Sequence, residues 1–222
     1  MKQRLLAALL ALYCLYPAPA TGQATKLLLP HDEASRQPDF FSFRARLLVS
    51  LAGRDTAGLL DVVAPQIRNT FGDDNGVAAF RRLWRLEAPD SEVWSELTAV
   101  LALGGTFENE STFVAPYVFS RWPSHYDAFD YLAVIASDVR IRSEPSSTAP
   151  VVTRVGFDVV QRARTTPKAL TPAQAALWEP IQLDSGRIGY MAKQFLRSPI
   201  GYRAVFIRRN NRWVMASFIA GD

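Results

Sequence analysis

Cysteine and histidine are nearly missing from this sequence. Its 222 residues hold one cysteine, Cys14, and two histidines, His31 and His125. Cys14 lies in an N-terminal segment that we predict to be cleaved, so we expect a mature chain without disulfide, cysteine nucleophile or thiolate metal ligand. H-x-x-x-H pairs, G-x-S-x-G turns and glycine-rich phosphate loops do not occur either. We therefore expect no metal, no cofactor and no catalytic residues.

An excess of one charge sign is also lacking. The sequence has 25 Lys and Arg against 21 Asp and Glu, and leaving out Lys2 and Arg4 of the predicted leader gives 23 against 21. Nucleic-acid binding calls for a concentrated basic face, which a surplus of two charges does not indicate. We expect no nucleic-acid partner.

Long hydrophobic runs are absent apart from one near the N-terminus, at residues 5–16. That run is shorter than the roughly 20 residues that a membrane-spanning helix needs. Lys2 and Arg4 precede it, and the small residues of 17–20 follow it, which is the pattern of a cleavable signal peptide. We predict a signal over residues 1–20, or a cut after Ala24, and an exported protein, periplasmic or extracellular, without a transmembrane segment in the mature chain.

Lipid attachment at Cys14 is the alternative interpretation of this leader. The residue before a lipidated cysteine should be small, and here it is Tyr13. We therefore favour the cleaved, unanchored form.

The rest of the chain changes from helical to strand-like spacing. Residues 21–38 lack periodicity and are predicted to be a mobile linker. Apolar residues then recur at helical intervals in four segments between 39 and 103, and alternate in shorter segments from 112 onward. The last two predicted strands, 202–208 and 213–219, flank Asn210 and Asn211, which tolerate the positive φ of a tight hairpin. The expected fold class is α+β.

Four motifs between residues 139 and 191 occur in an order that resembles the bacterial Src-homology-3-like domain. Residues 139–146 read VRIRSEPS, residues 149–152 read APVV, Trp178 follows after a longer segment than usual, and residues 184–191 read DSGRIGYM. The resemblance covers about residues 134–198 and implies a small β-barrel. Alternation within 139–142 is consistent with it, because the two aliphatic residues would face a core and the two arginines would face outward.

Barrels of this kind can bind an extended peptide in a shallow aromatic groove with charged residues at its rim. The resemblance implies that Arg142, Trp178 and Tyr190 are the ligand-binding residues, with Arg142 pairing with an acidic group. Each of these residues could instead serve the barrel itself, Trp178 as a core residue and Arg142 in an internal salt bridge.

The segments that flank the predicted barrel are similar, more faintly, to the cone-shaped nuclear-transport-factor-2-like fold. The similarity lies in the helical opening around residues 53–55, in residues 70–72 and in the C-terminal hairpin with Trp213. It implies one α+β domain, residues 39–133 plus 199–222, in which N-terminal helices cover the C-terminal hairpin and the barrel is inserted.

We predict an exported, non-catalytic cell-envelope binding protein whose barrel recognises peptidoglycan peptide or a protein partner. One alternative is an enzyme with an acid/base site in a cone-fold cavity, for which His125 and Asp127 are the candidates. Another is a structural protein whose barrel groove is occluded by the rest of the chain. The acidic run at 73–76 lacks the alternating oxygen ligands of a calcium loop, so we predict a turn and helix cap there.

Overall fold

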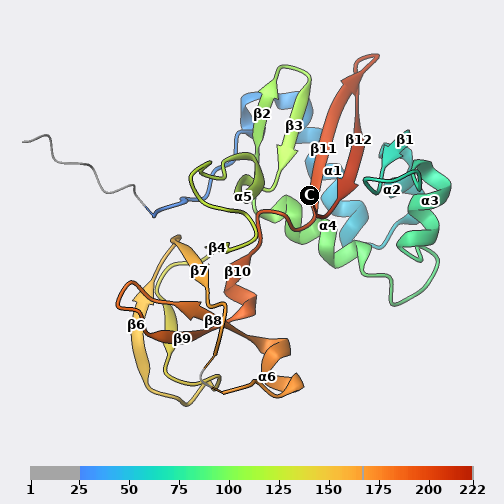
Figure 1. The fold of residues 1–222 in the computed structure, drawn as a ribbon. Helices are drawn as coiled ribbons and strands as arrows, with labels where there is room; N and C mark the ends of the chain where they lie inside the picture. Colours follow the sequence, from blue (N-terminus) through green and yellow to red (C-terminus); the bar gives the residue numbers. More distant parts are fainter. Residues whose placement is uncertain (1–25, 167, 222) are drawn as a thin grey trace, which may run out of the picture.

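The computed structural model describes residues 26–166 and 168–221, and shows helices with two separate β-sheets, an α+β fold (Figure 1). The predicted signal peptide and residues 21–25 of the predicted linker lie outside the described residues. Within the described part of the chain, no helix has the length and apolar character needed to cross a membrane.

The helices agree with the predicted helical segments in number and order up to residue 103. The α-helices and the short 3-10 helices (η) are η1 (Ala34–Arg36), α1 (Pro38–Ala52), α2 (Thr56–Val62), α3 (Gly76–Leu83), α4 (Val93–Ala102), α5 (Tyr117–Ser120), α6 (Pro172–Leu177) and η2 (Lys193–Phe195). Pro38 occupies the first turn of α1, where its missing N–H has no cost, and the Asp55 side chain caps α2 by accepting a hydrogen bond from the Gly58 N–H.

The first sheet contains β1 (Val63–Arg68), β2 (Thr106–Asn109), β3 (Thr112–Ala115), β11 (Arg203–Arg209) and β12 (Arg212–Ile219), in the order β1-β12-β11-β3-β2. Asn210 and Asn211 turn the β11–β12 hairpin with φ of 48° and 59°, as predicted. Alternation in the sequence does not predict β1, which contains Pro65. β1 pairs only with β12, in parallel, and an edge strand tolerates proline.

Helix α1 packs on the first sheet through aromatic rings. The Phe40 ring is fully buried, and its centroid lies 4.2 Å from that of Phe113, 4.9 Å from that of Trp213 and 5.8 Å from that of Phe206. These neighbours come from β3, β12 and β11, so one helical residue contacts three strands of the sheet. The space between this helix and the sheet is therefore filled with side chains.

The second sheet contains β4 (Tyr131–Val134), β5 (Val139–Arg142), β6 (Val151–Val155), β7 (Val159–Arg162), β8 (Trp178–Gln182), β9 (Ile188–Ala192) and β10 (Leu196–Arg197), in the order β10-β4-β7-β8-β9-β5-β6. Along β5, Val139 and Ile141 are buried whereas Arg140 and Arg142 are not, which confirms the predicted alternation. No ladder joins β6 back to β10 in the described part of the chain, so closure into a barrel stays a prediction.

The chain leaves the first sheet after α5, forms the second sheet and returns to the first for its last two strands (Figure 1). A buried cluster that includes Leu28, Tyr117 and Val159 fills the junction. A charge-assisted hydrogen bond of 2.8 Å between Arg197 on β10 and Glu96 on α4 adds to it.

The described part of the predicted linker is bound to both sheets. Leu28 is 5% exposed and its N–H donates to the Phe157 carbonyl beside the second sheet. The Glu33 carboxylate accepts a 2.9 Å hydrogen bond from the Phe107 N–H in β2 of the first sheet. Residues 26–37 thus connect the two sheets through hydrogen bonds. No periodic pattern in the sequence predicts these hydrogen bonds.

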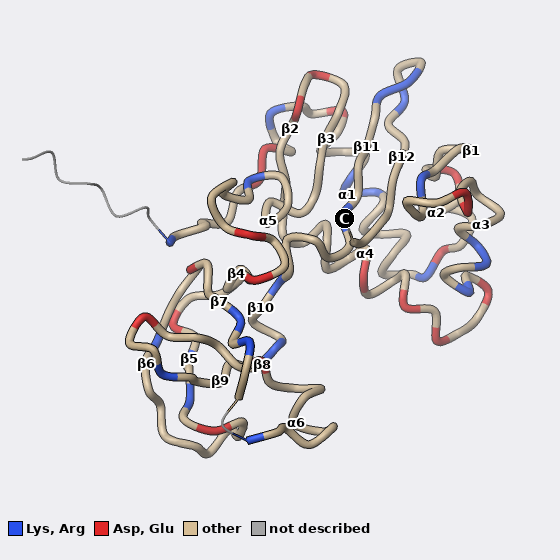
Figure 2. The backbone as a smooth tube through the Cα atoms, in the orientation of Figure 1, with Lys and Arg blue, Asp and Glu red and all other residues tan. Residues whose placement is uncertain are grey.

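Charges of both signs are interspersed over most of the backbone (Figure 2). The β11–β12 tip is more basic, with Arg208, Arg209 and Arg212 close together. Two of these are neutralised, because Arg208 pairs with Asp39 and Arg212 pairs with Asp61. The tip does not form the broad basic face that nucleic-acid binding calls for.

Candidate functional site: the Trp178 groove

A groove of about 700 Å³ lies on the second sheet. Its lining comes from β5, the loop after β5, the end of α6, the start of β8 and η2, and includes Arg140, Arg142, Leu177, Trp178, Lys193 and Phe195. We call it the Trp178 groove. Two of the three residues predicted to bind ligand, Arg142 and Trp178, line it, although they lie 36 positions apart in the sequence.

Helix α6 forms the apolar side of this groove. The Thr171 side chain accepts a hydrogen bond from the Gln174 N–H, and the Gln174 side chain accepts one from the Thr171 N–H, a capping box that starts the helix. The helix ends at Leu177, which is 65% exposed, and Trp178 follows at once as the first residue of β8. The segment before Trp178 thus supplies an exposed leucine beside a half-buried tryptophan.

The arginines of β5 differ in what they contact. Arg142 donates a 2.6 Å hydrogen bond to the Ala149 carbonyl, which ties the loop after β5 to the strand. Arg140 is exposed, and its guanidinium forms no hydrogen bond or ion pair with any of the described residues. Arg140 is therefore the cation best placed to receive an anionic group, and the alternation along β5 is the sequence signal that identifies it.

The other charges of the groove are largely engaged. Asp138 accepts a 2.6 Å hydrogen bond from Arg154. Lys193 donates to the Ala175 carbonyl at 2.6 Å and lies 3.6 Å from the Glu179 carboxylate. Because the single lining carboxylate is paired, the guanidinium of Arg140 leaves the groove with a positive potential.

Tyr190, the third predicted residue, does not line the groove. It is 6% exposed and lies opposite Arg142 in the β5–β9 ladder. The neighbouring Gly189 explains how tightly the strands pack there, because a Cβ atom at this position would lie 2.4 Å from Ile141 Cγ2. Tyr190 thus supports the strand pair from within, and Leu177 and Phe195, which the sequence did not single out, provide apolar lining instead.

The candidate acid/base pair is not assembled. His125 is exposed and its ring lies 4.2 Å from that of Tyr126. The Asp127 carboxylate accepts hydrogen bonds from the N–H groups of Phe129 and Asp130, so it holds the turn in which it lies. No hydrogen bond joins His125 to Asp127 among the interactions of the described residues.

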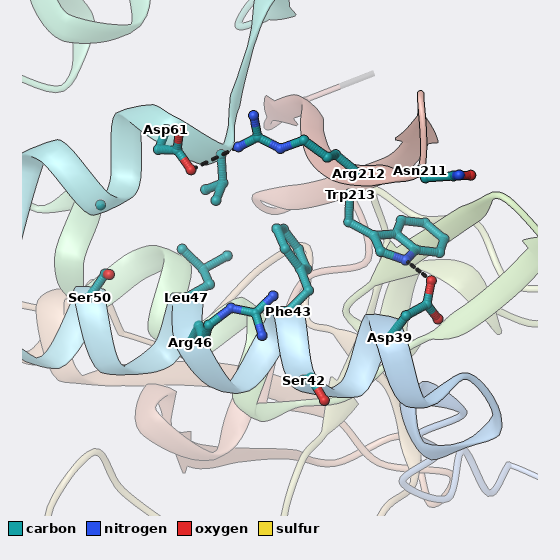
Figure 3. Close-up of a pocket in the computed structure, with 12 residues that line it drawn as sticks. Asp39, Ser42, Phe43, Arg46, Leu47, Ser50, Asp61, Asn211, Arg212 and Trp213 are labelled. Carbon is teal, nitrogen blue, oxygen red and sulfur yellow. Dashed lines mark hydrogen bonds and ion pairs between the residues drawn. The ribbon is translucent and has the colours of Figure 1, made fainter.

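A second cavity, of about 530 Å³, lies between α1, α2 and the β11–β12 tip (Figure 3). Its carboxylates are both paired: Asp39 accepts a 2.9 Å hydrogen bond from the Trp213 indole N–H, and Asp61 pairs with Arg212 at 3.0 Å. The Trp213 hydrogen bond lowers the pKa of Asp39 by more than burial raises it, and the Phe40 N–H and Arg208 lower it further. A carboxyl group with a lowered pKa stays ionised near neutral pH and is a poor general acid.

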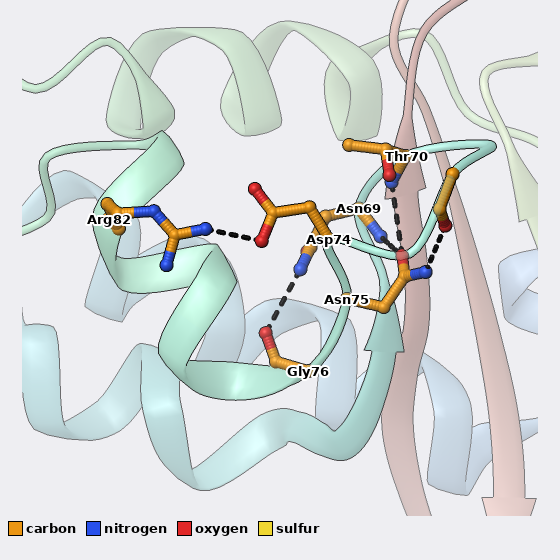
Figure 4. Close-up of polar contacts among 7 residues, drawn as sticks. Asn69, Thr70, Asp74, Asn75, Gly76 and Arg82 are labelled. Atoms are coloured by element: carbon orange, nitrogen blue, oxygen red, sulfur yellow. Dashed lines mark hydrogen bonds and ion pairs between the residues drawn. The ribbon is translucent and has the colours of Figure 1, made fainter.

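The acidic run at 73–76 leads into α3, but the predicted cap does not form through a side chain, because Asn75 stands at the N-cap position without a side-chain hydrogen bond to the helix (Figure 4). Asn75 is the N-cap residue of α3, and its side chain accepts hydrogen bonds from the N–H groups of Asn69 and Thr70. Asp74 pairs with Arg82. Across the described residues, no group of three or more His, Cys, Asp or Glu side chains is arranged to hold a metal ion.

Comparison with known proteins adds no family. No family model matches the chain, and no curated protein matches its sequence.

Proposed function

We propose that the protein is exported to the cell envelope and binds an extended, carboxylate-bearing peptide in the Trp178 groove, with peptidoglycan stem peptide as the ligand. The Src-homology-3-like interpretation of residues 134–198 is part of this proposal. Wall stem peptides are short, extended and rich in free carboxylates, which matches the charge and the shape of the groove.

The observation that carries the proposal is the position of Arg140. It is an exposed cation without an internal partner among the described residues, next to an apolar surface formed by Leu177, Trp178 and Phe195. A guanidinium binds a carboxylate through two parallel N–H donors, and aromatic and aliphatic side chains cover the body of a peptide. This pairing of a cation with an apolar floor favours an acidic peptide over a neutral or basic one.

The open groove also weighs against a purely structural role. Leu177 keeps 65% of its surface exposed, and Trp178 is half-buried rather than covered by the helices of the first sheet. A groove that served only to dock on the rest of the chain would have its apolar residues covered by it.

The test is co-sedimentation of residues 21–222 with purified peptidoglycan sacculi. Arg140→Glu should lower the affinity by about five- to tenfold, because it replaces attraction to a ligand carboxylate by repulsion, a change on the order of 1 kcal/mol at an exposed site. Trp178→Ala should lower it further by removing the apolar floor. Arg142→Ala is less informative, since Arg142 also holds the loop after β5.

Arg187→Glu is the matched control. Arg187 is an exposed arginine in the connection just before β9 of the same sheet, has no hydrogen bond or ion pair from its side chain in the described part of the chain, and lies outside the groove. Equal losses for Arg140→Glu and Arg187→Glu would indicate non-specific charge attraction and reject the groove. No binding by the unmodified chain would reject wall recognition, and a protein partner, captured by a photo-crosslinker at position 177, would replace it.

A further inference from the structure

A third cavity, of about 790 Å³, lies on the second sheet, between β6, β7 and the turn that joins β8 to β9. We call it the Gln182 cavity. Its volume falls in the range of pockets that enclose a small organic ligand. It shares no lining residue with the Trp178 groove, so a ligand of this cavity is independent of the function proposed for that groove.

A row of polar side chains crosses three neighbouring strands at this cavity. Tyr131 on β4 lies opposite Gln161 on β7, and Gln161 lies opposite Gln182 on β8. Residues that lie opposite each other in antiparallel strands project from the same face of the sheet, with Cβ atoms about 4.5–5.5 Å apart. All three residues line the cavity, so one phenol and two amides stand next to each other on its wall.

The polar groups of this wall are open to a ligand. The amides of Gln161 and Gln182 and the hydroxyls of Tyr126 and Tyr131 form no hydrogen bond within the described part of the chain. All four side chains are partly exposed, and none of their polar atoms belongs to the fully buried groups that lack a partner, so solvent reaches them. Amides and hydroxyls both donate and accept hydrogen bonds. The wall therefore suits a ligand whose polar groups also do both.

Two tyrosine rings supply the aromatic part of the wall. The ring centroids of Tyr126 and Tyr131 lie 4.9 Å apart at an angle of 44°. The Trp122 indole N–H donates a 2.9 Å hydrogen bond to the Tyr126 carbonyl and so fixes the backbone of that tyrosine. A tyrosine presents an apolar face together with a hydroxyl group. A sugar ring matches this arrangement, because it presents C–H groups on its faces and hydroxyl groups around its edge.

The charges that line the Gln182 cavity cancel. Lys26 pairs with Asp184 across it, and Asp158 accepts a 2.7 Å hydrogen bond from the Gly156 N–H. With Arg187, the lining holds two cations and two carboxylates. An ion of either sign would meet a like charge there, whereas a neutral ligand leaves the Lys26–Asp184 pair in place. The balance of charge therefore favours an uncharged ligand.

We propose that the Gln182 cavity binds a neutral oligosaccharide. The amides of Gln161 and Gln182 exchange hydrogen bonds with hydroxyl or acetamido groups of the sugar, and the rings of Tyr126 and Tyr131 pack on its C–H face. A purely apolar ligand would strip water from the two amides without replacing their hydrogen bonds. A neutral sugar needs no counter-charge, so Arg187→Glu still measures non-specific charge attraction in the sacculus experiment.

The probes are trisaccharides, titrated into the full mature chain and followed by ligand-observed NMR. Triacetylchitotriose and cellotriose are neutral, the glucosamine trimer is cationic and the galacturonic acid trimer is anionic. We expect saturable binding of a neutral trimer with a Kd of about 1 mM or tighter, and binding of both charged trimers that is weaker by about fivefold or more.

The two neutral trimers separate the sources of the sugar. Tighter binding of triacetylchitotriose would support the N-acetylated glycan of the cell wall as the ligand, and tighter binding of cellotriose would support a sugar without acetamido groups. Neither trimer carries a peptide, so the result does not depend on the Trp178 groove. Absence of saturable binding for both neutral trimers, or equal binding of a charged one, would overturn the proposal.

Two variants test the amides. Gln161→Leu and Gln182→Leu keep the approximate size of the side chain and remove groups that form no hydrogen bond within the described part of the chain. The urea midpoint should therefore stay near that of the wild type while the affinity for the neutral trimer falls about two- to tenfold. Gln66→Leu is the control, because Gln66 is an exposed glutamine of β1, outside the cavity and without a side-chain hydrogen bond to any described residue. Wild-type affinity in both cavity variants, or an equal loss in Gln66→Leu, would reject the site.

Discussion

The hydrogen bond between Glu96 and Arg197 should couple the two sheets more strongly than any exposed ion pair of this chain. The carboxylate and the guanidinium are 2.8 Å apart, and their side chains are 30% and 15% exposed. A hydrogen bond to a charged group contributes about 1.5–3 kcal/mol when shielded, and the remaining exposure lowers our expectation to about 1–2 kcal/mol. Asp61 and Arg212 form the reference pair, because they are 3.0 Å apart but both 66% exposed. For that pair we expect about 0.5 kcal/mol or less.

Two double-mutant cycles measure this difference. Glu96→Ala, Arg197→Met and their combination form one cycle, and Asp61→Ala, Arg212→Met and their combination form the other. The free energy of unfolding comes from urea titrations followed by tryptophan fluorescence and by circular dichroism, which must coincide for a two-state treatment. The single change Glu96→Ala should cost more than Asp61→Ala, because it leaves the less exposed arginine without its carboxylate.

Equal coupling energies in the two cycles would refute the reasoning, since the pairs have the same chemistry and nearly the same distance and differ chiefly in exposure. A coupling below about 0.5 kcal/mol for Glu96 and Arg197 would show that water screens this pair as it does a surface pair, and that the junction is held by its apolar cluster alone.

Three further predictions concern strand packing, acid stability and export. Gly189→Ala should destabilise the protein by about 1–3 kcal/mol in urea, because its Cβ would lie 2.4 Å from a buried side-chain atom; an unchanged midpoint would show that the strands can move apart. Asp39→Asn should lower the free energy of unfolding at neutral pH, where the Asp39 carboxylate is ionised and its hydrogen bonds stabilise the folded state. Because the pKa of Asp39 is lowered in the folded protein, this difference between wild type and variant should shrink as pH falls below 3.8, the ordinary pKa of an aspartate. A difference independent of pH would contradict the reasoning. Residues 1–24 fused to an alkaline phosphatase reporter should export it, and deletion of residues 5–16 should abolish the activity; export without that run would reject the signal.

The sequence determined most of the local structure. The helical spacing from Phe40 onward, the alternation along β5 and the asparagine pair at 210 and 211 each depend on residues close together in the chain, and each predicted element is present. Predictions failed where proline stood next to a strand. The strand-like alternation that begins at residue 112 ends at Ala115, because Pro116 lacks the N–H that would continue a ladder, and α5 follows.

The candidate site was predictable only in part. Arg142 and Trp178 were found through ordered motifs, and Arg140 follows from the same alternation, because these signals are local. The resemblance also placed Tyr190 in the binding groove, but Tyr190 is buried. Its burial depends on the pairing of β9 with β5, and no local sequence pattern predicts which strands pair.

Tertiary structure alone decided the rest. The pairing of Glu96 with Arg197 and the connection between the two sheets through residues 26–37 both join positions far apart in the sequence. Periodicity shows which side of an element is apolar, but it does not show which other element covers that side. Long-range hydrogen bonds and cavities depend on which elements pack against each other, and that packing is settled only when the whole chain folds.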